Sequence, residues 1–387
     1  MREISSELII YSNTTNKIIQ ASMHGFSIRL SKYRKKILLL LLFSTLTVVL
    51  LKMNTPWPNF VIRMYYWVNP RKDVVCHTIR LEDSLPDVSD AHPRKDRSIF
   101  FHETSCNSFL EGKIVINPRQ ACAVESAARL NPNMDVYLLY AAPGNVKNQT
   151  RQSDRILKLL QAYPNVKILH VDLGQYMTGT PVENLWTTRQ MQHSQYAQSH
   201  TSDVLRYLTL WKYGGIYLDL DVVVIKSLED LEANYAGVES DEAVAAGILS
   251  FDSSKEGQTF ANLSLLDLAE NFRGYDWGYN GPGTITRLVK KLCNVSSVKD
   301  MVGKKCQGFK LYPASKFYSI PWWKWEWFFN ETYLNEVIAH TKDSFIIHVW
   351  NKFSADLKIP LSCGDVPYLY FAKKYCPLVV EQCDYYF

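Results

Sequence analysis

The sequence has 387 residues, of which 47% are hydrophobic and 13% aromatic, with only 17 Gly and 16 Pro. Such a chain can bury a large core, which excludes disordered, collagen-like and repeat proteins. The formal net charge is +5, but residues 1–36 alone carry this excess, with seven basic and two acidic residues. The remainder is neutral overall and has no global field to attract a polyanion, so we expect no nucleic-acid partner.

An uncharged apolar stretch, residues 37–51, follows the basic tail and lies between Lys36 and Lys52. As a helix it would be about 22 Å long, so it spans a bilayer only if the two lysines extend toward the headgroups or the bilayer is thin. Because basic residues stay on the cytosolic side, we expect a signal anchor at 37–52, with the chain beyond it in the lumen. A cleaved signal peptide is the alternative, although no small-x-small cleavage motif follows the stretch.

Two further features are typical of a lumenal protein. The even number of cysteines, without the spacing of a zinc site, predicts disulfides, although their pairing stays open: Cys76, Cys106, Cys122, Cys293, Cys306, Cys363, Cys376 and Cys383. Four N-x-Ser/Thr sequons in the lumenal part are expected glycan sites: Asn148, Asn262, Asn294 and Asn330.

The expected lumenal part divides into a stem and an α/β domain. Residues 53–96 contain five prolines and little hydrophobic periodicity, which predicts the stem, and residues 97–387 form the domain. Short buried strands are expected at 98–102, 135–140, 166–171, 215–220, 222–225, 245–251 and 344–350. Helices are expected at 118–130, with Asn117 as N-cap, and at 153–162, 201–213 and 283–293. This alternation predicts a largely parallel sheet covered on both faces, with ligands at the carboxyl ends of its strands.

The segment 202–228 holds the main chemical signal. Ser202 is the expected N-cap of a helix that ends at Gly214 and Gly215, and the strand that follows leads into Asp219 and Asp221. In a strand these two carboxylates would share one face, about 7 Å apart at Cα, where they repel each other unless a cation binds between them. Hard divalent ions accept carboxylate and phosphate oxygens, so the pair predicts a metal holding a nucleoside diphosphate. The other interpretation is a solvated strand end whose acids meet Arg or Lys.

Four motifs together resemble the α1,4-glycosyltransferase family. They are SDxxRYxxLxxxGGxYxDxD (202–221), FFHETS (100–105), YNGPGTITRLVKKLC (279–293) and HVWNK (348–352). The resemblance extends from about residue 98 to the C-terminus. It implies a GT-A (Rossmann-like) α/β domain behind a single N-terminal transmembrane helix, in a type II Golgi membrane protein with its catalytic domain in the lumen.

The resemblance also implies roles at matching positions. Asp221 would be the main metal ligand, Asp219 would contact the metal or the donor, and Asp203, Arg206 and Tyr217 would bind the donor. The less specific positions retain alternatives, because each also has an ordinary structural interpretation. His348 is a metal ligand or a core histidine, and Asn280 a catalytic residue or part of a tight turn. Ser105, Phe100 and Phe101 would line the uridine pocket, with packing in the core as the alternative for the two phenylalanines.

The expected reaction is transfer of Gal or GalNAc, with retention, from a UDP-sugar to a terminal galactose or HexNAc of a glycolipid, with Mn²⁺ or Mg²⁺ as cofactor. Transfer of GlcNAc to glycoprotein glycans and a non-catalytic lumenal carbohydrate-binding protein are the alternatives. The aromatic stretch 321–329 (PWWKWEWFF) is either a platform for sugar rings, part of the core or a membrane-proximal surface.

Overall fold

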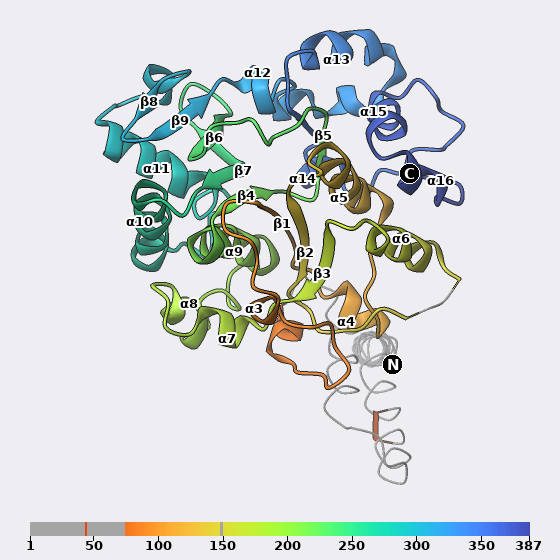
Figure 1. Ribbon diagram of the computed structural model, residues 1–387, viewed down its shortest axis with the longest axis horizontal. Coiled ribbons are helices and arrows are strands. Elements are labelled where there is room, and N and C mark those ends of the chain that lie inside the picture. The colour runs from red at the N-terminus through yellow and green to blue at the C-terminus, as the bar shows by residue number, and fades with distance from the viewer. Residues whose placement is uncertain (1–42, 45–73, 148–149) are drawn as a thin grey trace, which may run out of the picture. The chain divides into compact units, whose positions relative to one another are not determined.

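The computed structural model describes residues 43–44, 74–147 and 150–387, and those from 74 onward belong to one compact unit (Figure 1). Apart from Phe43 and Ser44, the expected anchor at 37–52 lies outside the described residues, as does Asn148. No helix within the described ranges has the length and apolarity needed to cross a bilayer.

A mixed sheet forms the centre of this unit. In the described residues it has eight strands, in the order β3 (Val166–His170), β2 (Asp135–Tyr140), β1 (Ser98–Glu103), β4 (Gly215–Leu218), β7 (Val244–Phe251), β6 (Tyr235–Val238), β9 (Phe309–Tyr312) and β8 (Lys305–Cys306). The first four are parallel, and β7 runs antiparallel to both of its neighbours. A separate antiparallel pair joins β5 (Val222–Val224) to β10 (Ile346–His348).

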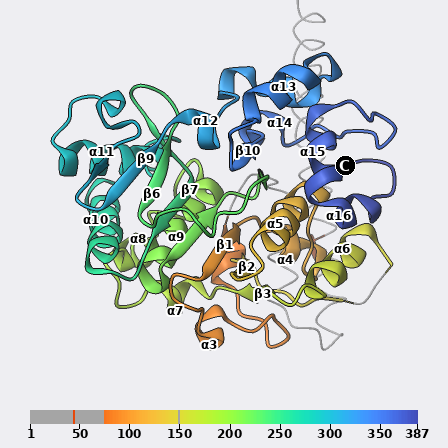
Figure 2. The same ribbon diagram turned by 45° about the horizontal axis from the view of Figure 1, so that its top comes forward.

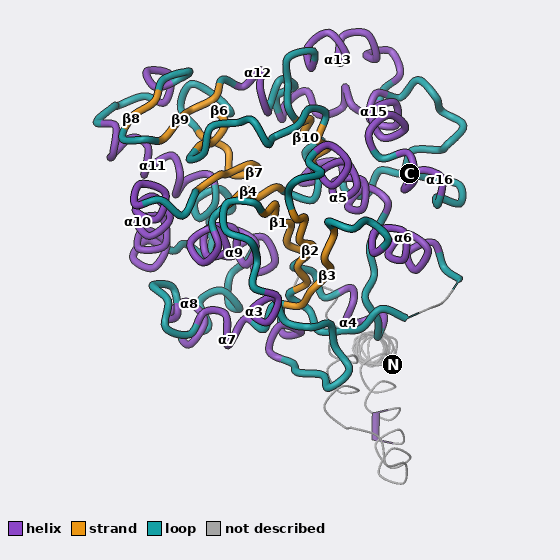
Figure 3. Tube along the Cα trace, viewed as in Figure 1, coloured by secondary structure: helices purple, strands orange, loops and turns teal. Residues whose placement is uncertain are grey.

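The sheet separates two hydrophobic cores because successive side chains of a strand point to opposite faces. In β1, Ile99 and Phe101 belong to the core under α5 (Pro118–Leu130) and α6 (Gln152–Gln161). Phe100 belongs to the other core, under α9 (Ala197–Tyr213), α10 (Lys255–Asn271) and α11 (Pro282–Cys293). Figures 2 and 3 show the strands between these two groups of helices.

Shorter helices complete the unit. They are η1 (Val75–Thr78), α3 (Val88–Ala91), α4 (Asn107–Glu111), α7 (Leu173–Met177), α8 (Glu183–Thr187), η2 (Val298–Met301), α12 (Ala314–Phe317), η3 (Trp322–Phe329), η4 (Glu331–Tyr333), α13 (Leu334–Thr341), α14 (Asn351–Ser354), α15 (Pro367–Tyr375) and α16 (Pro377–Glu381). Residues 74–96, part of the expected stem, pack against the domain, since Leu85 N donates to Gly144 O and Val88 is buried.

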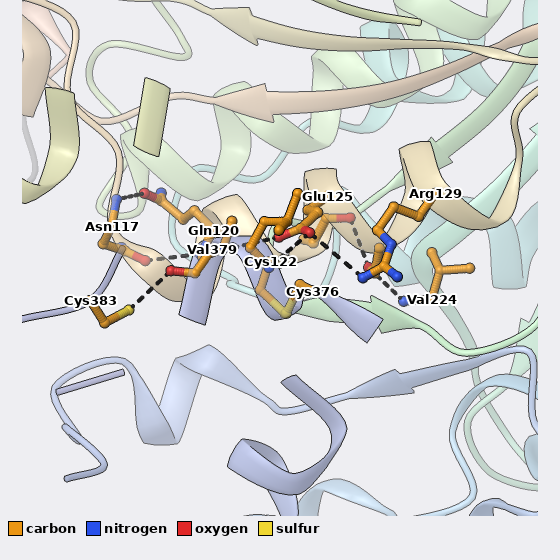
Figure 4. Close-up of a disulfide and its surroundings, with 12 residues drawn as sticks. Asn117, Gln120, Cys122, Glu125, Arg129, Val224, Cys376, Val379 and Cys383 are labelled. Atoms are coloured by element: carbon orange, nitrogen blue, oxygen red, sulfur yellow. Dashed lines mark hydrogen bonds and ion pairs between the residues drawn. A yellow bond between two sulfur atoms is a disulfide. The ribbon is translucent and has the colours of Figure 1, made fainter. Parts of the chain in front are cut away.

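The C-terminal segment is fastened to α5 (Figure 4). The predicted N-cap, Asn117, begins this helix with a capping box that includes Gln120. Glu125 in the middle of the helix accepts hydrogen bonds from the backbone of Leu378 and Val379, at the start of α16. The Cys122–Cys376 disulfide joins the same two segments.

The expectation of disulfides is confirmed. Two more join described cysteines, Cys76–Cys106 and Cys293–Cys306, whereas Cys363 and Cys383 carry free thiols.

The sequons differ in accessibility. Asn294 and Asn330 are exposed at helix ends, whereas Asn262 is half-buried within α10. Their glycosylation stays a prediction.

The α/β class is confirmed, and all seven expected strands and four expected helices are present. The largely parallel sheet is correct only for β3, β2, β1 and β4. The other half is mixed, since β7 is antiparallel to both of its neighbours while β6 and β9 are parallel to each other. The sequence analysis did not predict β6, β8 and β9, nor helix α10. Strand β6 is short and contains Gly237, and glycine weakens the strand signal.

Candidate active site

The two acids of the DxD motif lie in a turn. Strand β4 ends at Leu218 and β5 begins at Val222, so Asp219 and Asp221 are on the connection, and the expected strand geometry was wrong. The turn is held by Val222 N, which donates to Asp219 O (3.3 Å), and by Asp219 N, which donates to Gly247 O (2.9 Å). The turn places one oxygen of each carboxylate within 4.8 Å of the other.

His348 meets both acids from the other end of the chain. Its place is fixed by the antiparallel pairing of β10 with β5, in which His348 lies opposite Val222. Its Nε2 lies 3.3 Å from Asp221 Oδ1 and 3.6 Å from Asp219 Oδ2. Gly247 of β7 lies behind this contact, and a Cβ there would come within 2.9 Å of Asp219 and 3.0 Å of His348. The site therefore requires glycine at this position.

Helix α9 supplies the other charged groups of the site. It begins at Ala197, so Ser202 is an interior residue and the prediction of Ser202 as N-cap was wrong. The end of the helix at Gly214, with positive φ at Gly214 and Gly215, is confirmed. Because the first turn of the helix lies further back than predicted, Ser202 is free to accept a hydrogen bond from Arg206 Nη2 at 3.1 Å.

Arg206 is buried and connects the helix to the DxD turn. Its guanidinium lies 3.1 Å from Asp203, 3.3 Å from Asp219 Oδ1 and 4.7 Å from the ring centre of Tyr217. Tyr217 donates from its hydroxyl to the same Asp219 oxygen at 2.5 Å. The structure therefore brings together the predicted donor-site residues Asp203, Arg206, Tyr217 and Asp219.

The charges of this cluster shift one another's pKa values. Burial alone would raise the pKa of Asp219, but Arg206, His348 and the Tyr217 hydroxyl together lower it to about 2. Burial raises the pKa of Asp203 to about 7, and Arg206 only partly opposes this. Burial would lower the pKa of His348, but Asp221 and Asp219 outweigh it and raise it.

These residues fit a divalent cation. Asp219, Asp221 and His348 each offer one ligand atom, and the three atoms lie within 4.8 Å of one another. Two carboxylates and an imidazole suit Mn²⁺, and the carboxylates suit Mg²⁺. Asp221 has its second oxygen held by Asn351 N (2.7 Å), which orients the carboxylate toward the cluster.

A cavity of about 610 Å³ opens above the cluster. It is lined by the three candidate ligands and by Asp203 and Arg206. Ser105, in contrast, lines a second cavity of about 410 Å³, the Lys113 cavity, named after a buried lysine in its wall.

The remaining predicted residues do not line the large cavity. Phe100 and Phe101 are fully buried in the two cores. Asn280 is also fully buried, and its amide is used on both sides, accepting from Arg273 N at 2.9 Å and donating to Arg273 O at 2.8 Å. Its neighbour Pro282 lines the large cavity instead.

Several residues of the large cavity were missed. Glu239 follows the missed strand β6, and Trp277, Lys352 and Phe353 lie on the connections and short helix around it. The polar run Glu239–Glu242 is typical of a solvated loop, so its sequence gives no sign that Glu239 lines a cavity. No sequence pattern singled out Trp277 or Phe353. The aromatic stretch 321–329, which the sequence did single out, contributes Trp322 to the cavity.

Comparison with known proteins identifies the family of this chain. Residues 253–383 match the "Alpha 1,4-glycosyltransferase conserved region", and residues 117–238 match the "Glycosyltransferase sugar-binding region containing DXD motif". Lactosylceramide 4-alpha-galactosyltransferase of Homo sapiens is 30% identical over 342 residues, which cover 84% of this chain and 91% of that protein. This chain belongs to the α1,4-glycosyltransferases.

Other α1,4-glycosyltransferases are also similar. The Mus musculus lactosylceramide 4-alpha-galactosyltransferase is 32% identical over 294 residues, covering 75% of this chain and 78% of that protein. The alpha-1,4-N-acetylglucosaminyltransferase of Homo sapiens is 22% identical over 258 residues, covering 66% and 74%. In the present α1,4-glycosyltransferase, one matched region contains Asp203, Arg206 and the DxD turn, and the other contains His348, so the site is assembled from both.

Proposed function

We propose that this chain is a retaining, metal-dependent glycosyltransferase of the GT-A type. It would transfer Gal or GalNAc from a UDP-sugar to a terminal galactose or HexNAc of a glycolipid. The observation that carries the proposal is the convergence of Asp219, Asp221 and His348 beside Arg206 in one cavity. The glycolipid acceptor is supported by the names of the relatives that are about 30% identical.

The proposed site divides the work among its residues. Asp219, Asp221 and His348 hold Mn²⁺ or Mg²⁺, which when bound neutralises the charge that grows on the departing diphosphate. Arg206, fixed by Asp203 and Asp219, is placed to bind the nucleotide sugar. Tyr217 orients Asp219 through its hydroxyl. Ser105 and Asn280 do not reach this cavity, so any contribution they make to donor binding or catalysis is indirect.

The proposed setting is the Golgi lumen. A cytosolic tail (1–36), a signal anchor (37–52) and a stem would hold the catalytic domain at the membrane surface as a type II protein. Disulfides in the domain fit an oxidising compartment.

The experiment is turnover of UDP-Gal, UDP-GalNAc and UDP-GlcNAc by the full chain in detergent, with lactosylceramide or a glycoprotein glycan as acceptor. We expect transfer from UDP-Gal or UDP-GalNAc with Mn²⁺, and loss with a chelator. Asp221→Asn should lower turnover by about 10²–10³-fold, as for other removed groups that stabilise transition-state charge. Asp230→Asn, an exposed acid on the connection after β5, is the control.

Three results would contradict parts of the proposal. UDP-GlcNAc transfer to the glycoprotein glycan would favour the alternative donor and acceptor. Binding of UDP-sugar without transfer would favour a carbohydrate-binding protein. Unchanged turnover in Asp221→Asn would remove the metal role.

A further inference from the structure

The large cavity has two unlike parts. Its floor is charged and contains the candidate metal ligands and Arg206. Its rim is aromatic and more exposed, with relative exposures of 37% for Trp277, 43% for Trp322 and 40% for Phe353. Large aromatic side chains grouped at the mouth of a polar cavity are typical of a ligand-contact surface, because covering their apolar faces with a ligand removes apolar area from water.

The rim is an ordered wall. Trp322 stacks on Phe353, with ring centres 5.7 Å apart and planes 19° apart. Lys352 lies with Nζ 3.6 Å from the ring centre of Trp277 and 5.7 Å from that of Phe353, so its cation connects the two rings. These contacts hold the rings in place before a ligand arrives, which lowers the entropy cost of binding.

Glu239 is the acid of the cavity whose carboxylate has no hydrogen-bond donor among the described residues. Asp203 and Asp219 have Arg206, and Asp221 has Asn351 N. The Glu239 carboxylate forms no hydrogen bond or ion pair with any side chain in the described ranges, although the residue is not exposed. Its backbone is fixed by a turn in which Glu239 N donates to Ala243 O at 3.0 Å. Lys352 and His348 are close enough to act on the carboxylate electrostatically, but neither forms an ion pair with it. Its oxygens are therefore available to hydroxyl donors from a ligand.

We propose that Glu239 and the aromatic wall of Trp277, Trp322 and Phe353 form the acceptor subsite, which takes the terminal galactose ring of the acceptor glycan. The ring would lie with its C–H face on the wall and donate hydroxyl hydrogens to Glu239. This proposal rests on the proposed function, and it places the acceptor on the open side of the charged floor. Glu239 and Trp322 are binding residues for the acceptor and have no role in holding the donor.

The test separates acceptor from donor. KM is measured for free lactose and for lactosylceramide in micelles, and the Kd of UDP-galactose with Mn²⁺ is measured by calorimetry on the same full-length proteins. Glu239→Ala should raise the acceptor KM by about 10–100-fold, because it removes a hydrogen-bonding charge. Trp322→Ala should raise it by about 2–10-fold, the range of an aromatic contact. Neither variant should change the donor Kd by more than about twofold, because neither side chain forms a hydrogen bond or ion pair with the candidate metal ligands or Arg206, although the Glu239 charge acts on His348 from a distance.

Matched controls lie next to each residue. Trp323 is 57% exposed and adjacent to Trp322 but does not line the cavity, and Glu242 lies on the same turn as Glu239 with an exposed carboxylate. Glu242→Ala should leave both constants unchanged. Trp323 packs edge-on against Trp322, with ring centres 5.6 Å apart, so Trp323→Ala should leave the donor Kd unchanged and raise the acceptor KM less than Trp322→Ala does. Glu239→Gln tests charge, and should lie between wild type and Glu239→Ala.

Each other result decides against a named idea. If Glu239→Ala weakens UDP-galactose binding as much as it raises acceptor KM, Glu239 belongs to the donor site and the proposal is wrong. If Trp322→Ala affects lactosylceramide but not free lactose, the rim contacts the lipid and not the sugar. If the wild-type protein binds no UDP-sugar, the proposed function itself fails, and the acceptor subsite falls with it.

Discussion

The large cavity and the Lys113 cavity differ in how their acidic and basic side chains are paired. In the Lys113 cavity, the buried Lys113 pairs with Asp154 through both carboxylate oxygens, at 2.6 and 2.7 Å. Glu103 lies in the same wall, and burial raises its pKa to about 7. In the large cavity, the four acids Asp203, Asp219, Asp221 and Glu239 outnumber the lysine, arginine and histidine that line it with them, Lys352, Arg206 and His348.

The difference separates structural from functional charge. A matched buried pair is complete without a ligand, and its removal is expected to affect folding. An excess of acids at the floor of an open cavity is costly without an external cation, so it is expected to bind one. A perturbed charge alone would not distinguish the two cavities, whereas the count of partners does.

The largest effect is expected from breaking the matched pair. Lys113→Met leaves Asp154 buried without its cation and should lower the free energy of unfolding by about 3–5 kcal/mol. Urea unfolding measures this. Arg151→Met, which breaks an exposed pair with Glu111, is the control and should cost less than about 1 kcal/mol. The donor Kd of the folded Lys113→Met protein should be unchanged, and a weaker donor Kd would show that the Lys113 cavity takes part in donor binding.

A smaller effect is expected from Glu103. Its folded pKa, about 7, lies above its ordinary value of 4.5, so between these pH values only the folded state keeps the proton. The stabilisation is therefore full below pH 4.5 and is lost as the pH rises through 7, by about 3 kcal/mol in total. Glu103→Gln cannot titrate, so its stability should fall less than that of the wild type between pH 5 and pH 8.

The measurement is the unfolding midpoint in urea across this pH range. Glu111→Gln, an acid exposed in the same wall, serves as the control and should keep the wild-type pH dependence. Equal slopes for wild type and Glu103→Gln would mean that Glu103 is ionised in the folded protein at neutral pH.

The smallest effect is expected from the histidine of the unmatched cluster. His348→Ala leaves two carboxylates and should weaken Mn²⁺ binding by about 10–100-fold, or about 1–3 kcal/mol. Calorimetric titration of Mn²⁺ in the presence of UDP measures it, and high Mn²⁺ should restore turnover. His340→Ala, an exposed histidine on α13, is the control. If His348→Ala binds Mn²⁺ as the wild type does, His348 is a core histidine.

The sequence predicted the charged floor better than the rim. Helix α9 and its end at Gly214 follow from local patterns, and the structure brings Arg206 to Asp219 and places both DxD acids in one cavity, although they lie in a turn. Glu239 and Trp277 could not be predicted in the same way, because loops carry them and only the tertiary fold brings them to the cavity. The missed strand β6 has the same cause, since a four-residue strand with a glycine has little intrinsic preference.

The pairing of β10 with β5 sets an order in time. On the ribosome, Asp219 and Asp221 emerge long before His348, and the strand that completes their cluster belongs to the last part of the chain to be made. Until then β5 has an open edge and the two acids have no imidazole beside them. A nascent chain that ends before β10 therefore lacks the complete metal-binding geometry, even if its first strands have folded. Cation binding can begin only after β10 has been synthesised and has paired with β5.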